Sequence, residues 1–452
     1  MIPALKTPSL LQTVELIADP VKFLDRCSDR YGDTFSTRVL GLNSPPVVFF
    51  GSPEALQDIF TSPASQFDFS RATHVFKPLM GEQSIVLQQE RSHQRTRQLL
   101  LPPFHGERMR HYGELICKIT TDVTQHLNTG TSFLISEIIP DITLQIILQV
   151  VFGINPGSRY QKLKKLLSSL LEDVTSSLYS SLFFFPPLQW DLGAKSPWGS
   201  FLRRQQEIDK LIYSEIEERR NQNNTSLTDI LSLLLSARDE DGEPMTDIEL
   251  RDQLVSLLLL GYETTAASLA WAFYWIHSLP SVKEKLQAEL NQQELNPEQI
   301  AKLPYLTALC QETLRTYPIA LISMPRMAKE NMEIGGYQIK AKTVIIPCIY
   351  LAHQRPSTYH NPREFQPERF LNRKFTSYEF LPFGGGSRGC IGAAFSLYEM
   401  KLIVATILSQ FQLELADKKP IKPIRRGITI VPSGGVKMVV THQHQLQKVE
   451  SR

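Results

Sequence analysis

The chain lacks most of the features that mark secreted, nucleic-acid-binding or zinc proteins. Its five cysteines are scattered, odd in number and contain no Cys-x-x-Cys pair, which disfavours a disulfide framework, a zinc site and an iron–sulfur cluster. Lys and Arg number 48 against 46 Asp and Glu, with no block of like charge, so no electrostatic footprint for nucleic acid is present. Internal repeats and low-complexity tracts are also missing. These absences predict a reducing compartment and no nucleic-acid partner.

The N-terminal residues carry no targeting pattern. Met1 to Pro8 is too short and too rich in proline for a signal peptide or a membrane anchor. We therefore expect no transmembrane anchor and a cytoplasmic protein. One apolar segment, 182–190, is unusual for a loop, and it admits two interpretations, packing in the core or contact with a membrane.

One cysteine stands in a setting that favours metal chemistry. Cys390 follows a glycine-rich loop and precedes an apolar stretch, Ile391 to Leu408, with the composition of a helix. Free backbone N–H groups and the positive end of that helix are expected to stabilise a thiolate. A single thiolate with no second cysteine or histidine beside it suits a haem iron with one axial sulfur ligand.

The same segment admits two other interpretations. The glycines Gly384, Gly386 and Gly389 formally match a dinucleotide-binding pattern, which should follow a buried strand. The preceding residues make a poor strand, because Pro382 cannot donate to a ladder. A buried structural cysteine in a glycine-rich turn is the simpler alternative, and this segment alone does not exclude it.

The spacing of this segment resembles the haem-binding signature of the cytochrome P-450 family. The matching positions are Phe383, Gly386, Arg388, Cys390 and Gly392. The resemblance implies haem b as the cofactor, with Cys390 as the axial ligand and Arg388 against a haem propionate. It also implies that Phe383 packs beside the ligand loop and that the two glycines permit tight turns and close approach to the porphyrin.

A long apolar run, Leu254 to Leu279, carries an acid–hydroxyl pair in its middle. The run is long enough to cross a membrane, but Glu263 and Thr264 are costly in lipid, so we predict a buried helix of a globular protein. In the resembling family this pair relays protons during O2 activation, which implies that both residues are catalytic. A buried acid satisfied by helix carbonyls or water is the alternative for Glu263. Leu260 replaces the usual Ala or Gly of the family and is expected to narrow the space beside the haem.

Three residues outside the cysteine segment are further candidates for haem contact. His93 and Arg97 lie one helical turn apart and share a face of an early helix. In the family such a helix supplies propionate donors, whereas a basic solvated face is the alternative. Arg326, on a predicted strand, fits a further propionate contact.

A second charged motif is expected to be structural. Glu312 and Arg315 have the spacing of an ordinary helical ion pair. Together with Arg369 they resemble the Glu–Arg–Arg triad of the family. A buried network of this kind that lacks one member leaves an unpaired charge, so we expect all three residues to stabilise the fold.

The resemblance extends over nearly the whole chain and implies a mainly α fold with small β-sheets. In this fold the haem lies between a long central helix and the loop and helix of the cysteine ligand. We expect a single domain over residues 1–452, with an ordered core from about 8 to 440 and a polar tail at 441–452. Patterning predicts a hairpin at 36–50, helices at 54–60, 107–126, 198–221 and 282–290, and short strands within 334–346 and 411–440.

The implied activity is that of a haem-thiolate monooxygenase, which hydroxylates a hydrophobic substrate with O2. The chain is most similar to the soluble cyanobacterial branch of the family, which is associated with fatty acids and terpenes, so a fatty acid or terpenoid is the predicted substrate. Arg71 and Lys77 are candidates to anchor a substrate carboxylate. Electrons are expected from a separate ferredoxin-type or flavodoxin-type protein with its reductase. A haem-binding sensor or carrier without turnover is the alternative, but it leaves the pair at 263 and 264 unexplained.

Overall fold

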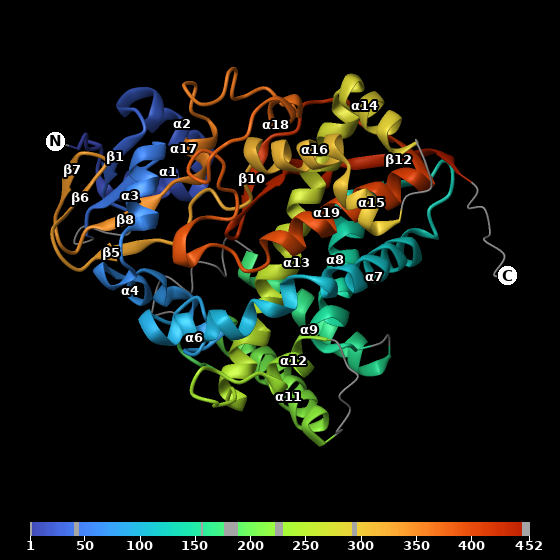
Figure 1. Cartoon of the computed structure of the whole chain (residues 1–452), viewed down its shortest axis with the longest axis horizontal. Helices are drawn as coiled ribbons and strands as arrows, with labels where there is room; N and C mark the ends of the chain where they lie inside the picture. The colour runs from blue at the N-terminus through green and yellow to red at the C-terminus, as the bar shows by residue number, and fades with distance from the viewer. Residues whose placement is uncertain are drawn as a thin grey trace.

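The computed structural model describes residues 2–39, 45–154, 157–175, 189–221, 229–291 and 296–444. Helices dominate these residues, and the strands form small sheets, so the predicted mainly α fold with small β-sheets is confirmed. Figure 1 shows the largest sheet on the N-terminal side, with the long helix α13 (Asp247–Ser278) crossing the middle of the molecule.

The other helices are α1 (Ser9–Ala18), α2 (Pro20–Tyr31), α3 (Pro53–Thr61), α4 (Phe69–Thr73), α5 (Lys77–Met80), α6 (Glu90–Leu100), α7 (Glu107–Thr124), α8 (Ile135–Phe152), α9 (Ser158–Thr175), α11 (Pro197–Asn221), α12 (Ile230–Ser236), α14 (Pro280–Leu290), α15 (Pro297–Lys302), α16 (Pro304–Thr316), α17 (Ile349–His353), α18 (Glu368–Asn372) and α19 (Ala393–Gln410). The helices predicted at 54–60, 107–126, 198–221 and 282–290 correspond to α3, α7, α11 and α14. Their ends shift by a few residues at most.

The strands are β1 (Thr34–Thr37), β2 (Val47–Phe50), β3 (Phe67–Asp68), β4 (Ser132–Leu134), β5 (Arg326–Ala328), β6 (Met332–Ile334), β7 (Tyr337–Ile339), β8 (Val344–Pro347), β9 (Phe411–Leu415), β10 (Pro423–Arg426), β11 (Thr429–Pro432) and β12 (Lys437–Gln443). The largest sheet has the order β1-β2-β8-β5-β3. The predicted hairpin is its β1–β2 pair, in which Thr34 is opposite Phe50 and Thr37 is opposite Val47.

Helix α13 is the buried helix that the long apolar run predicted. It begins at a capping box, because the Thr246 hydroxyl accepts from the N–H of Glu249 and the Glu249 carboxylate accepts in return from Thr246. Both α8 and α13 are long and apolar enough to cross a membrane, yet they pack against each other and most of their residues are buried. Helix α19, which directly follows the cysteine loop along the chain, packs beside α13 (Figure 1).

The C-terminal segment differs from the prediction. Pairing between β12 and β9 continues to His442 and Gln443, so regular structure extends beyond 440. The main-chain hydrogen bonds of β9 hold these polar residues in the ladder, which a composition argument does not detect. Residues 445–452 lie outside the described part of the chain.

The predicted triad is formed, with Glu312 and Arg315 fully buried and the Arg369 side chain 8% exposed. The Glu312 carboxylate accepts from Arg315 at 2.6 and 2.8 Å and from Arg369 at 3.1 Å. It also accepts from the backbone N–H of Gln366 at 2.8 Å. Other N–H groups of the Arg315 guanidinium donate to backbone carbonyls, including that of His353 at 2.9 Å. The network ties α16 to the segment that leads into α18, and its charges are paired.

Candidate haem centre

Cys390 lies at the end of a loop that is closed by its own backbone. The N–H of Cys390 donates to the carbonyl of Phe383 at 2.9 Å, and the N–H of Gly389 donates to the carbonyl of Gly386 at 3.1 Å. From α6, the Arg97 guanidinium donates to the carbonyl of Gly389 at 2.7 Å. The fold therefore brings Arg97 of α6 to the loop that contains Phe383, Gly386 and Cys390.

The two predicted glycines have different reasons to be glycine. Gly386 has φ +64°, and a Cβ there would lie 2.7 Å from the carbonyl oxygen of Phe60, so a tight turn and a close approach both require it. Gly392 has an ordinary φ of −84°, and no atom lies within 4 Å of where its Cβ would be. The backbone conformation at Gly392 therefore does not require glycine, contrary to the expected tight turn. The room that its missing side chain leaves beside Cys390 fits a group other than the polypeptide.

The polypeptide alone does not stabilise a thiolate at Cys390. Part of the side chain is exposed, yet protein atoms surround the sulfur, and this burial raises the pKa of the thiol. The N–H of Gly392 and the charge of Arg97 oppose the shift but are outweighed. Within the polypeptide alone, these groups lower the pKa without offsetting burial. A bound metal cation would supply the remaining stabilisation, because a coordinating thiol loses its proton on binding.

Three arginines from separate elements converge near the loop. Arg97 comes from α6, Arg326 from β5, and Arg388 from the cysteine loop itself. Burial, followed by the charge of Arg97, lowers the pKa of Arg388 to about 10. Burial likewise lowers the pKa of Arg326 to about 9, aided by the charge of Arg388. The charge of Arg97 thus lowers the pKa of Arg388, and the charge of Arg388 lowers that of Arg326.

Within the described residues, the hydrogen-bond partners of this cluster are neutral. Arg388 donates to the carbonyls of Ile85 and Gln88 at 3.2 and 2.6 Å. Arg326 donates to the carbonyl of Ile59 at 3.2 Å. The buried Nε atoms of Arg326 and Arg388 have no hydrogen-bond partner among the described residues. Buried positive charge without a counterion is costly, so the cluster fits a ligand with two carboxylates, as haem b provides in its propionates.

Helix α6 presents its basic residues to two different surroundings. Arg91 and Arg95 pair with acidic residues of the segment 239–249. His93 is 6% exposed, and burial, followed by the charges of Arg388 and Arg97, lowers its pKa to about 3. The alternative of a solvated basic face is therefore wrong for His93. Its neutral imidazole offers an N–H donor beside the arginines without adding charge.

One face of α13 is only half-buried, whereas most of the helix is fully buried. Leu257, Leu260, Gly261 and Thr264 form this face, with the spacing of successive helical turns. The Thr264 hydroxyl donates to the carbonyl of Leu260 at 2.7 Å, so the two residues are neighbours as predicted. A Cβ at Gly261 would lie 3.0 Å from Ile147 of α8, so helix packing also favours glycine there.

Glu263 turns from that face toward the β10–β11 hairpin. Its carboxylate lies 4.0 Å from the guanidinium of Arg426, and its buried Oε1 has no hydrogen-bond partner among the residues described. Burial raises the pKa of Glu263 to about 7, against the opposing charge of Arg426. The carboxyl group can therefore both hold and release a proton near neutral pH. Sequence reasoning missed Arg426, which no local pattern connects to α13.

A second set of polar groups joins α13 to α19. The Thr265 hydroxyl lies 3.1 Å from that of Ser396 and donates to the carbonyl of Gly261. Glu399, on the same side of α19, is 2% exposed, and burial raises its pKa well above the usual value. Sequence reasoning missed Ser396 and Glu399 as well, although both follow Cys390 within three turns of helix.

The proposed carboxylate anchors are not positioned as such. Arg71 and Lys77 are exposed, and Lys77 forms an ion pair with Glu82. The structure does not describe residues 182–188, which are most of the apolar segment at 182–190.

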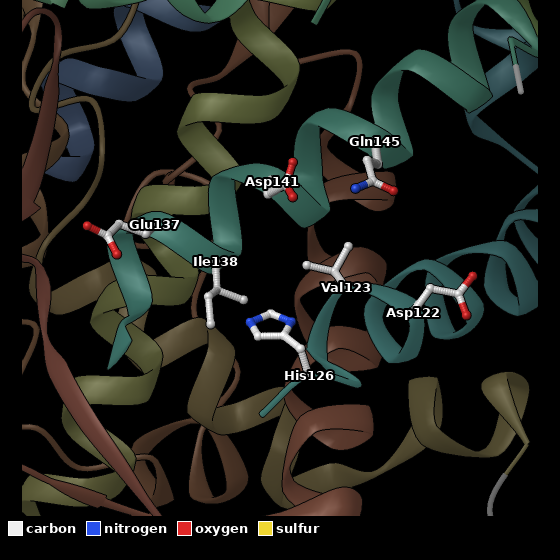
Figure 2. Close-up of a pocket in the computed structure, with 7 residues that line it drawn as sticks. All are labelled: Asp122, Val123, His126, Glu137, Ile138, Asp141 and Gln145. Carbon is white, nitrogen blue, oxygen red and sulfur yellow. The ribbon is translucent and has the colours of Figure 1, made fainter. Parts of the chain in front are cut away.

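A separate hollow lies between α7 and α8, away from every residue predicted for the haem. Figure 2 shows its lining side chains, Asp122, Val123, His126, Glu137, Ile138, Asp141 and Gln145. Asp141 also forms an ion pair with Lys164. The hollow has acidic and apolar walls, and it contains no residue that sequence analysis singled out.

Comparison with known proteins decides the family. The model of the family described as Cytochrome P-450 matches residues 6–439. The chain belongs to the cytochrome P-450 family. Cytochrome P-450 135A1 of Mycobacterium tuberculosis is 32% identical over 451 residues, covering 98% of this chain and 96% of the relative. Cytochrome P-450 135B1 of Mycobacterium bovis is 31% identical over 432 residues, covering 95% and 89%.

The fold has a solved counterpart in the same family. The cyanobacterial CYP120A1 bound to retinoic acid superposes with a TM-score of 0.84 at 22% identity, covering 98% of this chain and 99% of that one. Membership of the family makes the protein a monooxygenase with haem b held by a cysteine thiolate. The predicted family, enzyme class and cofactor are confirmed, and the sensor or carrier alternative is superseded.

Proposed function

We propose that this enzyme hydroxylates a fatty acid or terpenoid, with Cys390 as the axial ligand of the haem. The observation that carries the assignment of the site is a cluster of one buried and two half-buried arginines with no carboxylate partner among the described residues, which lies beside the only exposed cysteine of the five. The room left by Gly392 next to that cysteine supports the same placement.

Each residue of the centre has a defined task in this proposal. Bound haem supplies the activation of O2 and the oxidation of a C–H bond. Arg97, Arg326 and Arg388 neutralise the propionates, and the neutral His93 donates a further hydrogen bond. The hydrogen bond from Cys390 N–H to the Phe383 carbonyl keeps the loop closed and the sulfur in place.

Protons would be delivered by side chains of α13. Glu263 receives a proton from solvent beside Arg426, whose side chain is 47% exposed. With a pKa of about 7, the carboxyl group can pass that proton on and be recharged. The Thr264 hydroxyl donates a hydrogen bond to the Leu260 carbonyl in this structure. In the proposed route it rotates to hold the proton on the half-buried face of the helix. This route makes Glu263 and Thr264 catalytic residues and Arg426 a positioning residue.

The substrate class rests on the apolar lining and on one relative. Leu257 and Leu260 present branched aliphatic side chains on the face that holds Thr264. The structural relative binds retinoic acid, a terpenoid carboxylic acid, which makes this acid the first compound to test here. We place the enzyme in the cytoplasm, with electrons delivered by a separate ferredoxin-type or flavodoxin-type protein.

The carbon monoxide difference spectrum of the reduced protein tests the ligand. We expect the strongly red-shifted Soret band of thiolate ligation, its loss in Cys390→His, and its retention in the control Cys117→Ser. A band that survives in Cys390→His would exclude Cys390 as the ligand.

The acid–hydroxyl pair is tested by the yield of product per NAD(P)H. Thr264→Ala should consume electrons at a comparable rate but form much less product, because protons no longer arrive in the right place. Ser268→Ala, one turn further along the helix, serves as the control, since Ser268 is buried and its hydroxyl already donates to the Thr264 carbonyl at 2.9 Å. An unchanged yield in Thr264→Ala would contradict the relay.

A further inference from the structure

Helix α1 exposes an aliphatic face to solvent. Leu10 is 73% exposed, Leu11 45%, Val14 54% and Ile17 49%. Three of these residues recur at helical spacing, while Gln12 faces inward and is 2% exposed. A short helix that turns its apolar residues outward is unusual, because folding normally buries them.

The exposed face continues onto the β10–β11 hairpin. Ile424 is 47% exposed and Ile428 is 54% exposed. Between them, the Arg425 guanidinium donates to the carbonyl of Ile17 at 3.3 Å, so the hairpin adjoins the end of α1. We call the six residues Leu10, Leu11, Val14, Ile17, Ile424 and Ile428 the α1–hairpin patch. They are six of the eleven large apolar residues that are exposed in the described part of the chain.

The border of the patch carries a net positive charge. Lys6 and Lys22 are exposed on either side of α1 along the chain, and the backbone of the exposed Arg38 is held by the side chain of Gln12. Asp19, at the C-terminal end of α1, is the exposed acid among them. The one acid within the helix, Glu15, is neutralised by Arg26 at 2.5 Å. An aliphatic face with a basic border complements the acyl chains and headgroups of an anionic lipid surface.

The composition also distinguishes a lipid surface from a protein partner. The patch holds Leu, Val and Ile only, whereas the centres of protein interfaces are enriched in aromatic residues and Met. From the patch, the hairpin runs inward to α13, where Trp271 donates to the carbonyl of Ile430 at 3.1 Å.

We propose that the α1–hairpin patch docks the enzyme on an anionic membrane surface as a peripheral protein. The aliphatic side chains enter the boundary between headgroups and acyl chains, and the exposed Lys6 and Lys22 lie among the anionic headgroups. This docking goes beyond the proposed activity, and it would hold the enzyme where hydrophobic compounds concentrate.

Co-sedimentation of the holoenzyme with vesicles tests the proposal. Vesicles of phosphatidylglycerol and phosphatidylcholine should bind the protein, and vesicles of phosphatidylcholine alone should bind it more weakly. Val14→Asp with Ile17→Asp should lower the partition coefficient on anionic vesicles at least ~10-fold, because two aliphatic side chains that would enter the membrane are lost. Ile248→Asp is the matched control, since Ile248 is 59% exposed on α13 and lies outside the patch.

The outcomes separate the possible occupants. A second variant, Lys6→Glu with Lys22→Glu, should remove the salt-dependent part of binding and keep the fold, as circular dichroism would report. Equal binding by the wild type and by the Val14 and Ile17 variant would overturn the proposal. So would a wild-type dimer that this variant converts to a monomer, because the patch would then face a second copy. The sedimentation readout needs no turnover, so it stands even if the proposed substrate class fails.

Discussion

Two arginine clusters in the described part of the chain are built on opposite principles. Around Glu312, two guanidinium groups share one carboxylate, and every side chain of the triad is less than a tenth exposed. Around Arg388, three guanidinium groups meet without a carboxylate among the described residues, and two Nε atoms have no partner there. The first cluster is complete within the polypeptide, whereas the second needs a dianion. Charge balance therefore separates a structural network from a cofactor site, although both contain buried arginines.

The largest effect is expected when the complete cluster is broken. Glu312→Gln leaves Arg315 and Arg369 buried without their anion, so the free energy of unfolding should fall by ~3–5 kcal/mol. Urea denaturation of the haem-free protein measures this change. Glu298→Gln is the control, because the pair of Glu298 with Arg110 is exposed and contributes at most ~1 kcal/mol. Similar losses in both variants would show that the triad is not special.

The incomplete cluster should respond with the opposite sign. Arg326→Met removes an unpaired buried charge from among the rings of Phe60, Phe67 and Phe69, so the haem-free protein should be as stable or more stable. The same change removes a propionate partner, and haem should dissociate at least ~10-fold faster. Urea denaturation and transfer of haem to a haem-free globin measure the two effects. Destabilisation with unchanged haem loss would make Arg326 structural.

Acid should weaken the fold through His93. Its pKa is lowered to about 3 in the folded protein from an ordinary value of 6.5, so the unfolded chain binds the proton more tightly. The contribution of His93 to stability is complete above pH 6.5 and is lost as the pH falls from there toward 3. His93→Gln should flatten this pH dependence in the haem-free protein. Parallel curves for the variant and the wild type would place the acid sensitivity elsewhere.

The smallest effect concerns the half-exposed ion pair at the proton entrance. Arg426→Gln removes the charge that holds the pKa of Glu263 down, so that pKa should move above about 7. Infrared titration of the protonated carboxyl band, assigned with Glu263→Gln, follows the shift directly. Arg425→Gln, at the adjacent residue of the hairpin, is the control and should leave the carboxyl band in place. A band that titrates identically in Arg426→Gln would show that Arg426 does not affect the pKa of Glu263.

The parts of the molecule that local patterns determine were predictable. The apolar run around Glu263 predicted a buried helix because its central polar residues disfavour lipid, although its length would span a membrane. The glycine spacing located the loop of Cys390. The opposing directions of His93 and Arg91 on α6 follow from helical spacing, but only the tertiary fold assigns each direction its surroundings. Tertiary packing likewise brings Arg426 to Glu263, and it raises the pKa of Cys390 although the adjacent helix end opposes the shift. Such electrostatic results depend on burial, which composition does not supply.

Arg388 fastens the backbone at Ile85 and Gln88 to the cysteine loop through two hydrogen bonds. Both bonds are made within the polypeptide, so one side chain joins the backbone at 85–88 to the loop that carries Cys390. The remaining Nε of Arg388 is buried and has no partner among the described residues. Any movement of the segment at 85–88 would therefore also shift positive charge beside Cys390, which couples the mobility of one segment to the electrostatics of another.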